Sequence, residues 1–137
     1  MSNGVKFVIL GQPCSKANSR RLVSFGKRPA VIKSKDALAY ERDARRQIPG
    51  MARLMFQGPV RVTLRLYYAS ERPDLDESIV LDVLQPLYAK IGRKRVMTQR
   101  GVYLNDRQVR EKHVFHGIDK KHPRAEIMVE ALEEQLL

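Results

Sequence analysis

The sequence predicts an α+β fold, with residues 1–137 forming one domain in which a mixed β-sheet packs against two main helices. Apolar residues recur at every second position in some segments and at helical spacing in others. These segments follow one another in the order β-α-β-α-β-β. A chain of 137 residues, of which 43% are hydrophobic, can bury one core but is short for two domains.

The first three predicted elements are a strand, a helix and a strand. Residues 5–10 are rich in β-forming side chains and end before a glycine and a proline. Residues 34–48 place apolar side chains at helical spacing, with Ser34 as a possible cap and Pro49 after the last turn. Residues 60–67 alternate apolar and polar side chains, which indicates a strand with one face on a core.

The last three predicted elements are a helix and two strands. Residues 78–85 gather their apolar side chains on one helical face, and Pro86 ends or kinks that helix. Residues 109–118 and 125–132 are predicted strands, joined by a polar turn. Residues 131–137 also contain good helix formers, so a helical end is the alternative there.

The charge of the chain indicates a polyanionic partner. The sequence has 26 Lys and Arg against 15 Asp and Glu, a formal net charge of +11. Binding to phosphates releases condensed counterions, which gives basic proteins affinity for nucleic acid regardless of base sequence. Solubility alone is the alternative explanation, and ribosomal and membrane-surface proteins are basic too.

The positive charges gather in two stretches, around residues 16–35 and 90–100. Both are bounded by turn-forming glycines, and the first also contains prolines, so we expect exposed loops. Neither carries aromatic side chains at regular stacking intervals, which favours duplex or junction DNA over single strands. The predicted DNA-binding residues are Lys16, Arg20, Arg21, Lys33, Lys35, Lys90 and Lys94.

Three aspartates are candidate metal ligands. Asp74 and Asp76 follow a predicted strand, and in extended geometry their side chains point to one side, about 7 Å apart. Asp106 precedes another predicted strand and could reach the same sheet edge. Mg²⁺ suits such a site because it takes a few carboxylates and leaves room for substrate phosphate. In the alternative interpretation, Asp76 caps the following helix and Asp74 is simply solvated.

Four segments of the chain, in order, resemble the RusA-like Holliday-junction resolvases, a family of crossover junction endodeoxyribonucleases. The first begins at Gln12-Pro13 and ends at Asn18-Ser19-Arg20-Arg21, and the second is Ala39-Tyr40-Glu41-Arg42. The third is Arg72-Pro73-Asp74-Leu75-Asp76-Glu77, and the fourth is Asn105-Asp106-Arg107-Gln108-Val109. The resemblance covers most of the chain.

The resemblance implies a magnesium-dependent endonuclease that resolves four-way or other branched DNA and works as a homodimer. Its three catalytic, metal-binding aspartates map onto Asp74, Asp76 and Asp106, and Mn²⁺ may replace Mg²⁺. A bound water would attack the phosphodiester in line, without a covalent intermediate. Recombination, repair and phage DNA processing are the settings that fit.

Two positions depart from the pattern of that family. Val80 stands where the family usually has a lysine, and Glu77 stands where it has an asparagine. Both changes remove or oppose positive charge at the scissile phosphate. One hypothesis is that Lys16, Lys90 or Lys94 supplies this charge from a loop. A protein that binds branched or duplex DNA without cutting it is therefore the main alternative, and a ribosomal-type RNA-binding module is a third.

Other classes of site find little support in the sequence. The three histidines are not spaced to converge on zinc, and no complete phosphate-binding loop motif indicates a nucleotide cofactor. The apolar runs are far shorter than the roughly 20 residues of a membrane span. Cys14 is the single cysteine, and no signal-peptide pattern is present. The expected location is the cytoplasm of a bacterial or phage-infected cell.

Overall fold

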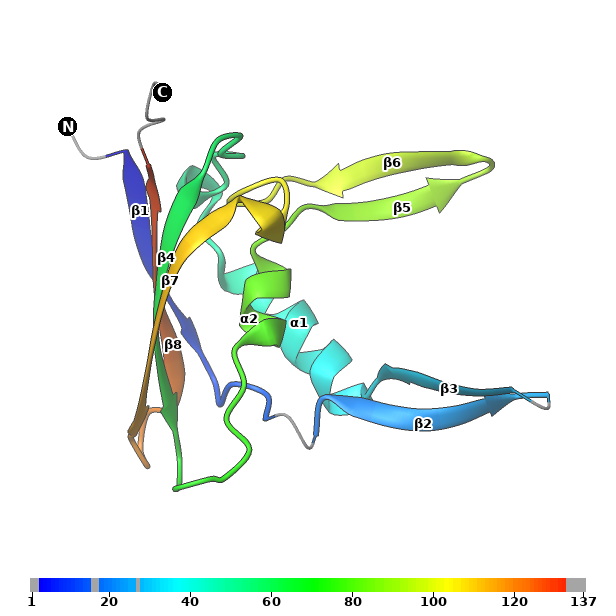
Figure 1. The fold of residues 1–137 in the computed structure, drawn as a ribbon, viewed down its shortest axis with the longest axis horizontal. Coiled ribbons are helices and arrows are strands. Elements are labelled where there is room, and N and C mark those ends of the chain that lie inside the picture. Colours follow the sequence, from blue (N-terminus) through cyan, green and yellow to red (C-terminus); the bar gives the residue numbers. More distant parts are fainter. Residues whose placement is uncertain (1–2, 16–17, 27, 133–137) are drawn as a thin grey trace.

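The computed structural model describes residues 3–15, 18–26 and 28–132 and has a four-stranded mixed sheet at its centre (Figure 1). The strand order is β1-β8-β4-β7, in which β4 pairs parallel to β7 and antiparallel to β8, and β8 pairs antiparallel to β1. The strands are β1 (Gly4–Leu10), β4 (Val60–Tyr68), β7 (Val109–Ile118) and β8 (Arg124–Ala131). The α+β class and the predicted order of the main elements are confirmed.

Two helices lie on one side of this sheet, α1 (Lys35–Gln47) and α2 (Ser78–Val83). Helix α1 begins at Ser34, whose hydroxyl accepts a hydrogen bond from the Ala37 amide at 3.0 Å, as the sequence predicts. The short 3-10 helices η1 (Gly50–Ala52) and η2 (Asp106–Gln108) complete the connections.

The alternation along β4 builds the core. Val60, Val62, Leu64 and Leu66 are fully buried at 0% exposure, while Arg61 and Thr63 alternate with them on the less buried face. Burying one such side chain contributes about 1.5–3 kcal/mol. Because β4 has a neighbour on each side, its register fixes where the chain leaves the sheet toward α2.

The two basic stretches are β-hairpins and not loops, which corrects the prediction from the sequence. We call β2 (Arg20–Phe25) with β3 (Arg28–Lys33) arm 1, and β5 (Leu87–Ile91) with β6 (Lys94–Gln99) arm 2. Gly26 and Gly92 occupy the hairpin turns with positive φ angles of 63° and 64°. The sequence thus indicates the turn-forming glycines but does not predict the strands on either side of them. Figure 1 shows both arms projecting from the body on the helical side.

The C-terminal strand is confirmed through Ala131, which pairs with Val60 of β4. The alternative of a helical end covered residues 131–137: Ala131 ends β8, Leu132 is not helical, and residues 133–137 lie outside the described part of the chain. Among the described residues, no helix is long and apolar enough to cross a membrane.

Candidate nucleic-acid interface

Nearly all of the net positive charge belongs to the two arms and their immediate ends. Residues 20–33 contain five Lys and Arg, residues 87–100 contain five more, and neither stretch contains an acidic residue. Subtracting these ten from the 26 Lys and Arg leaves 16, against 15 Asp and Glu, so the rest of the chain is close to neutral. The arms are therefore the part of the molecule that a polyanion would contact first.

Ion pairing reinforces this division between arms and body. On the body, Arg61 pairs with Glu111 and Glu130, and Arg124 pairs with Asp119 and Glu126. Within the described residues, the only arm cation in a salt bridge is Lys33, at the base of arm 1. The other arm cations that the structure describes make no salt bridge, so their charge is available to a ligand.

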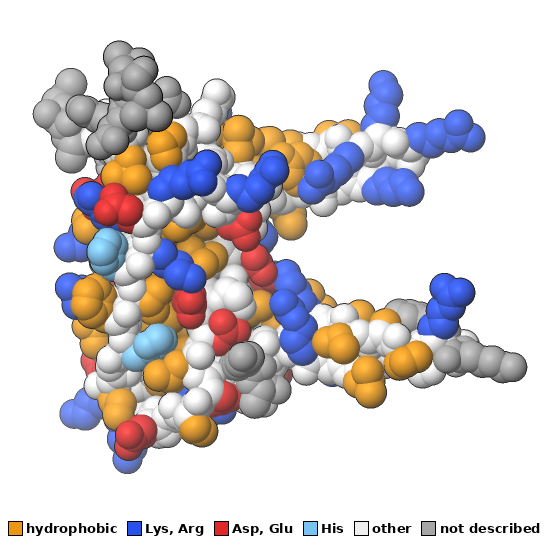
Figure 2. All heavy atoms as spheres, viewed as in Figure 1, with side chains coloured by type: hydrophobic (Ala, Val, Ile, Leu, Met, Phe, Trp, Pro, Cys, Tyr) orange, Lys and Arg blue, Asp and Glu red, His pale blue; other side chains and the backbone are white. Residues whose placement is uncertain are grey.

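Acidic side chains lie on the body between the arms. Figure 2 shows two arms bearing Lys and Arg, an open space between them, and acidic groups on the body facing that space. A pocket of about 320 Å³ lies there, lined by Lys33 at the base of arm 1, Asp82 of α2, and Tyr88 and Arg95 of arm 2. The positive charge of the arms thus flanks an acidic surface of the body, which we call the floor.

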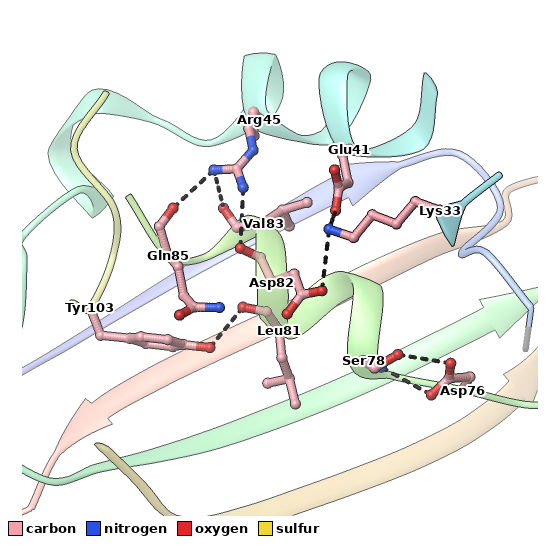
Figure 3. Close-up of polar contacts among 10 residues, drawn as sticks. All are labelled: Lys33, Glu41, Arg45, Asp76, Ser78, Leu81, Asp82, Val83, Gln85 and Tyr103. Atoms are coloured by element: carbon pink, nitrogen blue, oxygen red, sulfur yellow. Dashed lines mark hydrogen bonds and ion pairs between the residues drawn. The ribbon is translucent and has the colours of Figure 1, made fainter. Parts of the chain in front are cut away.

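The Asp82 carboxylate of this floor lies beside Lys33 of arm 1 (Figure 3). The Lys33 ammonium forms an ion pair with Glu41 of α1 and lies 3.6 Å from the Asp82 carboxylate. Burial raises the pKa of the Asp82 carboxyl, Lys33 opposes that shift, and the negative charges of Glu41 and Asp106 reinforce it. A second cation near Asp82 would therefore be electrostatically favourable.

The position of Asp82 is fixed by contacts to the last turn of α2. The Arg45 guanidinium donates to the carbonyls of Gln85 at 2.9 Å, Asp82 at 3.3 Å and Val83 at 3.4 Å. The Tyr103 hydroxyl donates to the Leu81 carbonyl at 2.9 Å, as Figure 3 shows. These bonds satisfy carbonyls that a helix end leaves without partners, and they tie α1 and the η2 region to α2.

Asp106 lies beside this end of α2, in a turn built by Gln108. The Gln108 side chain accepts from the Leu104 and Asn105 amides at 2.9 and 2.8 Å and donates to the Phe56 carbonyl at 2.6 Å. The exposed Asp106 carboxylate makes no hydrogen bond or salt bridge within the described residues, while its backbone N–H donates to the Gln85 side chain at 3.4 Å. The turn therefore brings the Asp106 carboxylate near enough to Asp82 for its charge to raise the pKa of Asp82.

Asp74 and Asp76 lie before the other end of α2 and have local partners. The Arg72 guanidinium pairs with the Asp74 carboxylate at 3.1 Å and donates to the Ser15 hydroxyl at 3.2 Å. The Asp76 carboxylate accepts from the Ser78 amide at 3.1 Å and from its hydroxyl at 2.8 Å. This matches the alternative in which Asp76 serves the start of the helix, whereas Asp74 is paired and not simply solvated.

The described structure does not gather the three predicted aspartates into one ligand set. Asp74 and Asp76 precede α2 and Asp106 lies beside its last turn, and six helical residues span about 9 Å. Among the described residues, no group of three or more His, Cys, Asp or Glu is arranged to hold a metal ion. Asp82 and Asp106 interact electrostatically, since the charge of Asp106 contributes to raising the pKa of Asp82.

The predicted DNA-binding residues fall mainly on the arms. Arg20 and Arg21 begin β2, Lys33 ends β3, Lys90 lies on β5, Lys94 begins β6, and Lys35 is the first residue of α1. Lys16 lies outside the described residues. Of the described lysines, Lys33 is the one that reaches the carboxylates through a salt bridge.

The two positions that depart from the family pattern have structural roles here. Val80 is 1% exposed and belongs to the hydrophobic core, so a lysine at this position would be buried. The Glu77 carboxylate pairs with Lys112 of β7 at 3.0 Å, which fastens the start of α2 to the sheet. Neither residue supplies a free positive charge, whereas Lys33 forms salt bridges with Glu41 and Asp82 of the floor.

Sequence reasoning missed Asp82, Arg45 and Tyr88 as candidate site residues and included Arg95 only as part of the second basic stretch. Asp82 stands within a segment that was identified by its apolar face, and Arg45 within a helix that contains several other charged residues. The one available signal was that Asp82 is the only charged residue in the helix Ser78–Val83. The sequence matches no protein-family model and no curated protein sequence.

Proposed function

We propose that this protein is a Mg²⁺-dependent, structure-specific endodeoxyribonuclease that holds branched DNA, such as a Holliday junction, between its two arms. The observation that carries the proposal is the division of charge: two cationic hairpins, in whose described residues only Lys33 is ion-paired, flank a floor of carboxylates on an otherwise nearly neutral body. Nucleases that use metal ions need both features, cations to hold the phosphate backbone and carboxylates to hold the ion.

In this proposal the arms position the backbone and the floor carries the chemistry. Lys90 and Lys94 contact phosphates on one side of the space, and Arg20 and Arg21 contact them on the other. Asp82 and Asp106 would hold Mg²⁺, and Lys33 would neutralise a phosphate oxygen next to them. The bound ion would polarise the phosphate and lower the pKa of a water molecule.

The test is cleavage of a labelled synthetic four-way junction and a matched linear duplex, in Mg²⁺ or in EDTA. We expect paired nicks near the branch that require Mg²⁺. Asp82→Asn and Asp106→Asn should abolish the nicks while leaving junction binding intact. Asp43→Asn is the matched control, because Asp43 is an exposed carboxylate of α1 whose partner is Arg46.

The same assay discriminates between the two ligand sets. If Asp74→Asn and Asp76→Asn abolish cleavage while Asp82→Asn does not, the set predicted from the sequence is correct, and the segment before α2 must rearrange on binding. If wild type gives no nicks with Mg²⁺ or Mn²⁺, the endonuclease proposal is wrong.

A DNA-binding protein that does not cut is the second candidate. Two of the three predicted ligands, Asp74 and Asp76, already have protein partners, and Val80 is buried where the family resemblance expects a lysine. Tight junction binding without nicks under any divalent ion would establish this alternative. A homodimer remains a prediction from the resemblance, and sedimentation of the free protein tests it.

A further inference from the structure

The pocket between the arms has an unusual wall on the side of arm 2. The Arg95 guanidinium lies over the Tyr88 ring, with its central carbon 4.0 Å from the ring centroid. The cross-strand register pairs Tyr88 with Met97 and Lys90 with Arg95, so Tyr88 and Arg95 share one face of the hairpin. Because both residues line the pocket, that face turns toward the carboxylates.

Other residues that line the pocket offer hydrogen-bonding groups. Gln85 and Asn105 both line it, and each uses its side-chain oxygen within the protein. Gln85 accepts from the Asp106 amide and Asn105 accepts from the Arg107 amide. In the described part of the chain, neither side-chain NH₂ group donates to another residue, so both can donate to a ligand.

Two of the three cations that line the pocket are already engaged within the protein. The Arg45 guanidinium is engaged by three carbonyls of the α2 end, and Lys33 is shared between Glu41 and Asp82. Asp82 itself contributes negative charge to the lining. Arg95, stacked on Tyr88, and the amides of Gln85 and Asn105 together offer a flat surface and hydrogen-bond donors, which suit a flat group with polar edges.

We propose that this pocket binds one unpaired nucleobase of the DNA substrate. Aromatic rings and guanidinium planes are the surfaces on which proteins stack unpaired bases, and Asn and Gln amides bond to base edges. The volume of about 320 Å³ is at the small end of ligand pockets and suits a single base. The inference rests on the proposed function, because it places the base beside the carboxylates that would cut the adjoining backbone.

The test compares two branched DNA probes that differ in one position at the branch, an unpaired nucleotide or an abasic site. Because stacking one base contributes about 1–3 kcal/mol, wild type should bind the base-containing probe at least about fivefold more tightly. Tyr88→Leu should remove this preference, whereas Tyr88→Phe, which keeps the ring, should retain it. Arg95→Lys should reduce it while keeping the charge.

Arg46→Lys is the control for the arginine substitution, because Arg46 lies on α1, pairs with Asp43 and is not part of the pocket. Equal affinity of wild type for the two probes overturns the inference and leaves the proposed function standing. Loss of affinity for both probes alike in Arg95→Lys and Tyr88→Leu also overturns it, because the residues would then serve general binding. If wild type binds neither probe, the proposed function fails as well.

Discussion

The central sheet and the two arms are built on opposite principles. On β4 every second side chain is fully buried, and on the sheet Arg61 and Arg124 are paired with carboxylates. On the arms, apolar side chains stand in solvent, with Leu22 71%, Val31 65% and Ile91 62% exposed. The sheet therefore carries the stability of the molecule, and the arms carry charge and shape that a ligand can use.

This difference between the sheet and the arms predicts which property a mutation in each region should change. A two-stranded hairpin without a buried face adds little stability of its own. Substitutions in the sheet should therefore alter unfolding, while charge substitutions in the arms should alter binding and leave unfolding nearly unchanged.

The largest effect is expected in the sheet. Leu64→Ala removes a fully buried side chain from the central strand and should lower the free energy of unfolding by about 2–5 kcal/mol. Urea denaturation followed by circular dichroism measures this. Leu22→Ala, at an exposed position of arm 1, is the matched control and should change it by less than about 0.5 kcal/mol. A loss for Leu22→Ala as large as that for Leu64→Ala would break the comparison.

A second substitution tests the joint between arm 2 and the body. A Cβ atom at Gly101 would lie 2.6 Å from the Gln85 carbonyl carbon and 2.6 Å from the Pro86 nitrogen, so backbone must move. Gly101→Ala should destabilise the protein by about 1–3 kcal/mol. The Cβ atom added in Gly58→Ala meets no atom within 4 Å, so this variant should melt close to wild type. Thermal melting measures both variants. Equal melting temperatures for the two variants would contradict the close packing at this joint.

Removing charge from arm 2 tests, through DNA binding, whether the cations of the arms and the paired cations of the sheet differ in their contacts with phosphate. A plot of log K against log salt concentration falls less steeply when fewer phosphates are neutralised. Replacing Lys90, Arg93 and Lys94 by Gln should therefore reduce the steepness of this slope by about 2.7 for a four-way junction. The same measurement on Arg61→Gln and Arg124→Gln, whose charges are already paired, should change the slope much less. Melting temperatures should stay close to wild type for the arm variant. An unchanged slope would show that arm 2 does not contact phosphates.

The smallest effect concerns the pH dependence of stability. Burial raises the pKa of Asp82 in the folded protein. At pH values between the unfolded and the folded pKa, Asp82 is therefore protonated in the folded protein and ionised in the unfolded chain. Above the folded pKa, the ionised Asp82 carboxylate lowers the free energy of unfolding. This loss disappears as the pH falls through that pKa. Relative to Asp82→Asn, wild type should gain stability from pH 7 toward about pH 4. A difference that stays constant or moves the other way would contradict the assigned burial.

The main elements of the sheet and helices could be predicted from the sequence because burial imposes a period. Val60, Val62 and Leu64 alternate, and Ser34 stands where α1 needs a cap. The arms could not be predicted in this way, since a hairpin that projects into solvent has no buried face and its strands carry mixed charge and apolar residues. Their turn glycines were visible, but turns alone do not separate a hairpin from a loop.

The candidate site was predicted only in part, for a geometric reason. The spacing of Asp74 and Asp76 suggests a shared side in an extended strand, but the chain turns after β4 and directs each carboxylate to a local partner. Asp106 is exposed near the end of α2, where Asp82 lies close to it. That proximity depends on how Gln108 folds the turn and how Arg45 holds the helix end, which no local pattern reveals.

The most direct test of the account is hydrogen exchange of the protein with and without a four-way junction, in EDTA so that the DNA stays intact. The account predicts slower exchange in both arms and at the end of α2 when DNA is bound, with little change in β1 and β8. Protection confined to the outer face of the sheet, or to one arm alone, would contradict the claim that the substrate lies between the arms above the carboxylates.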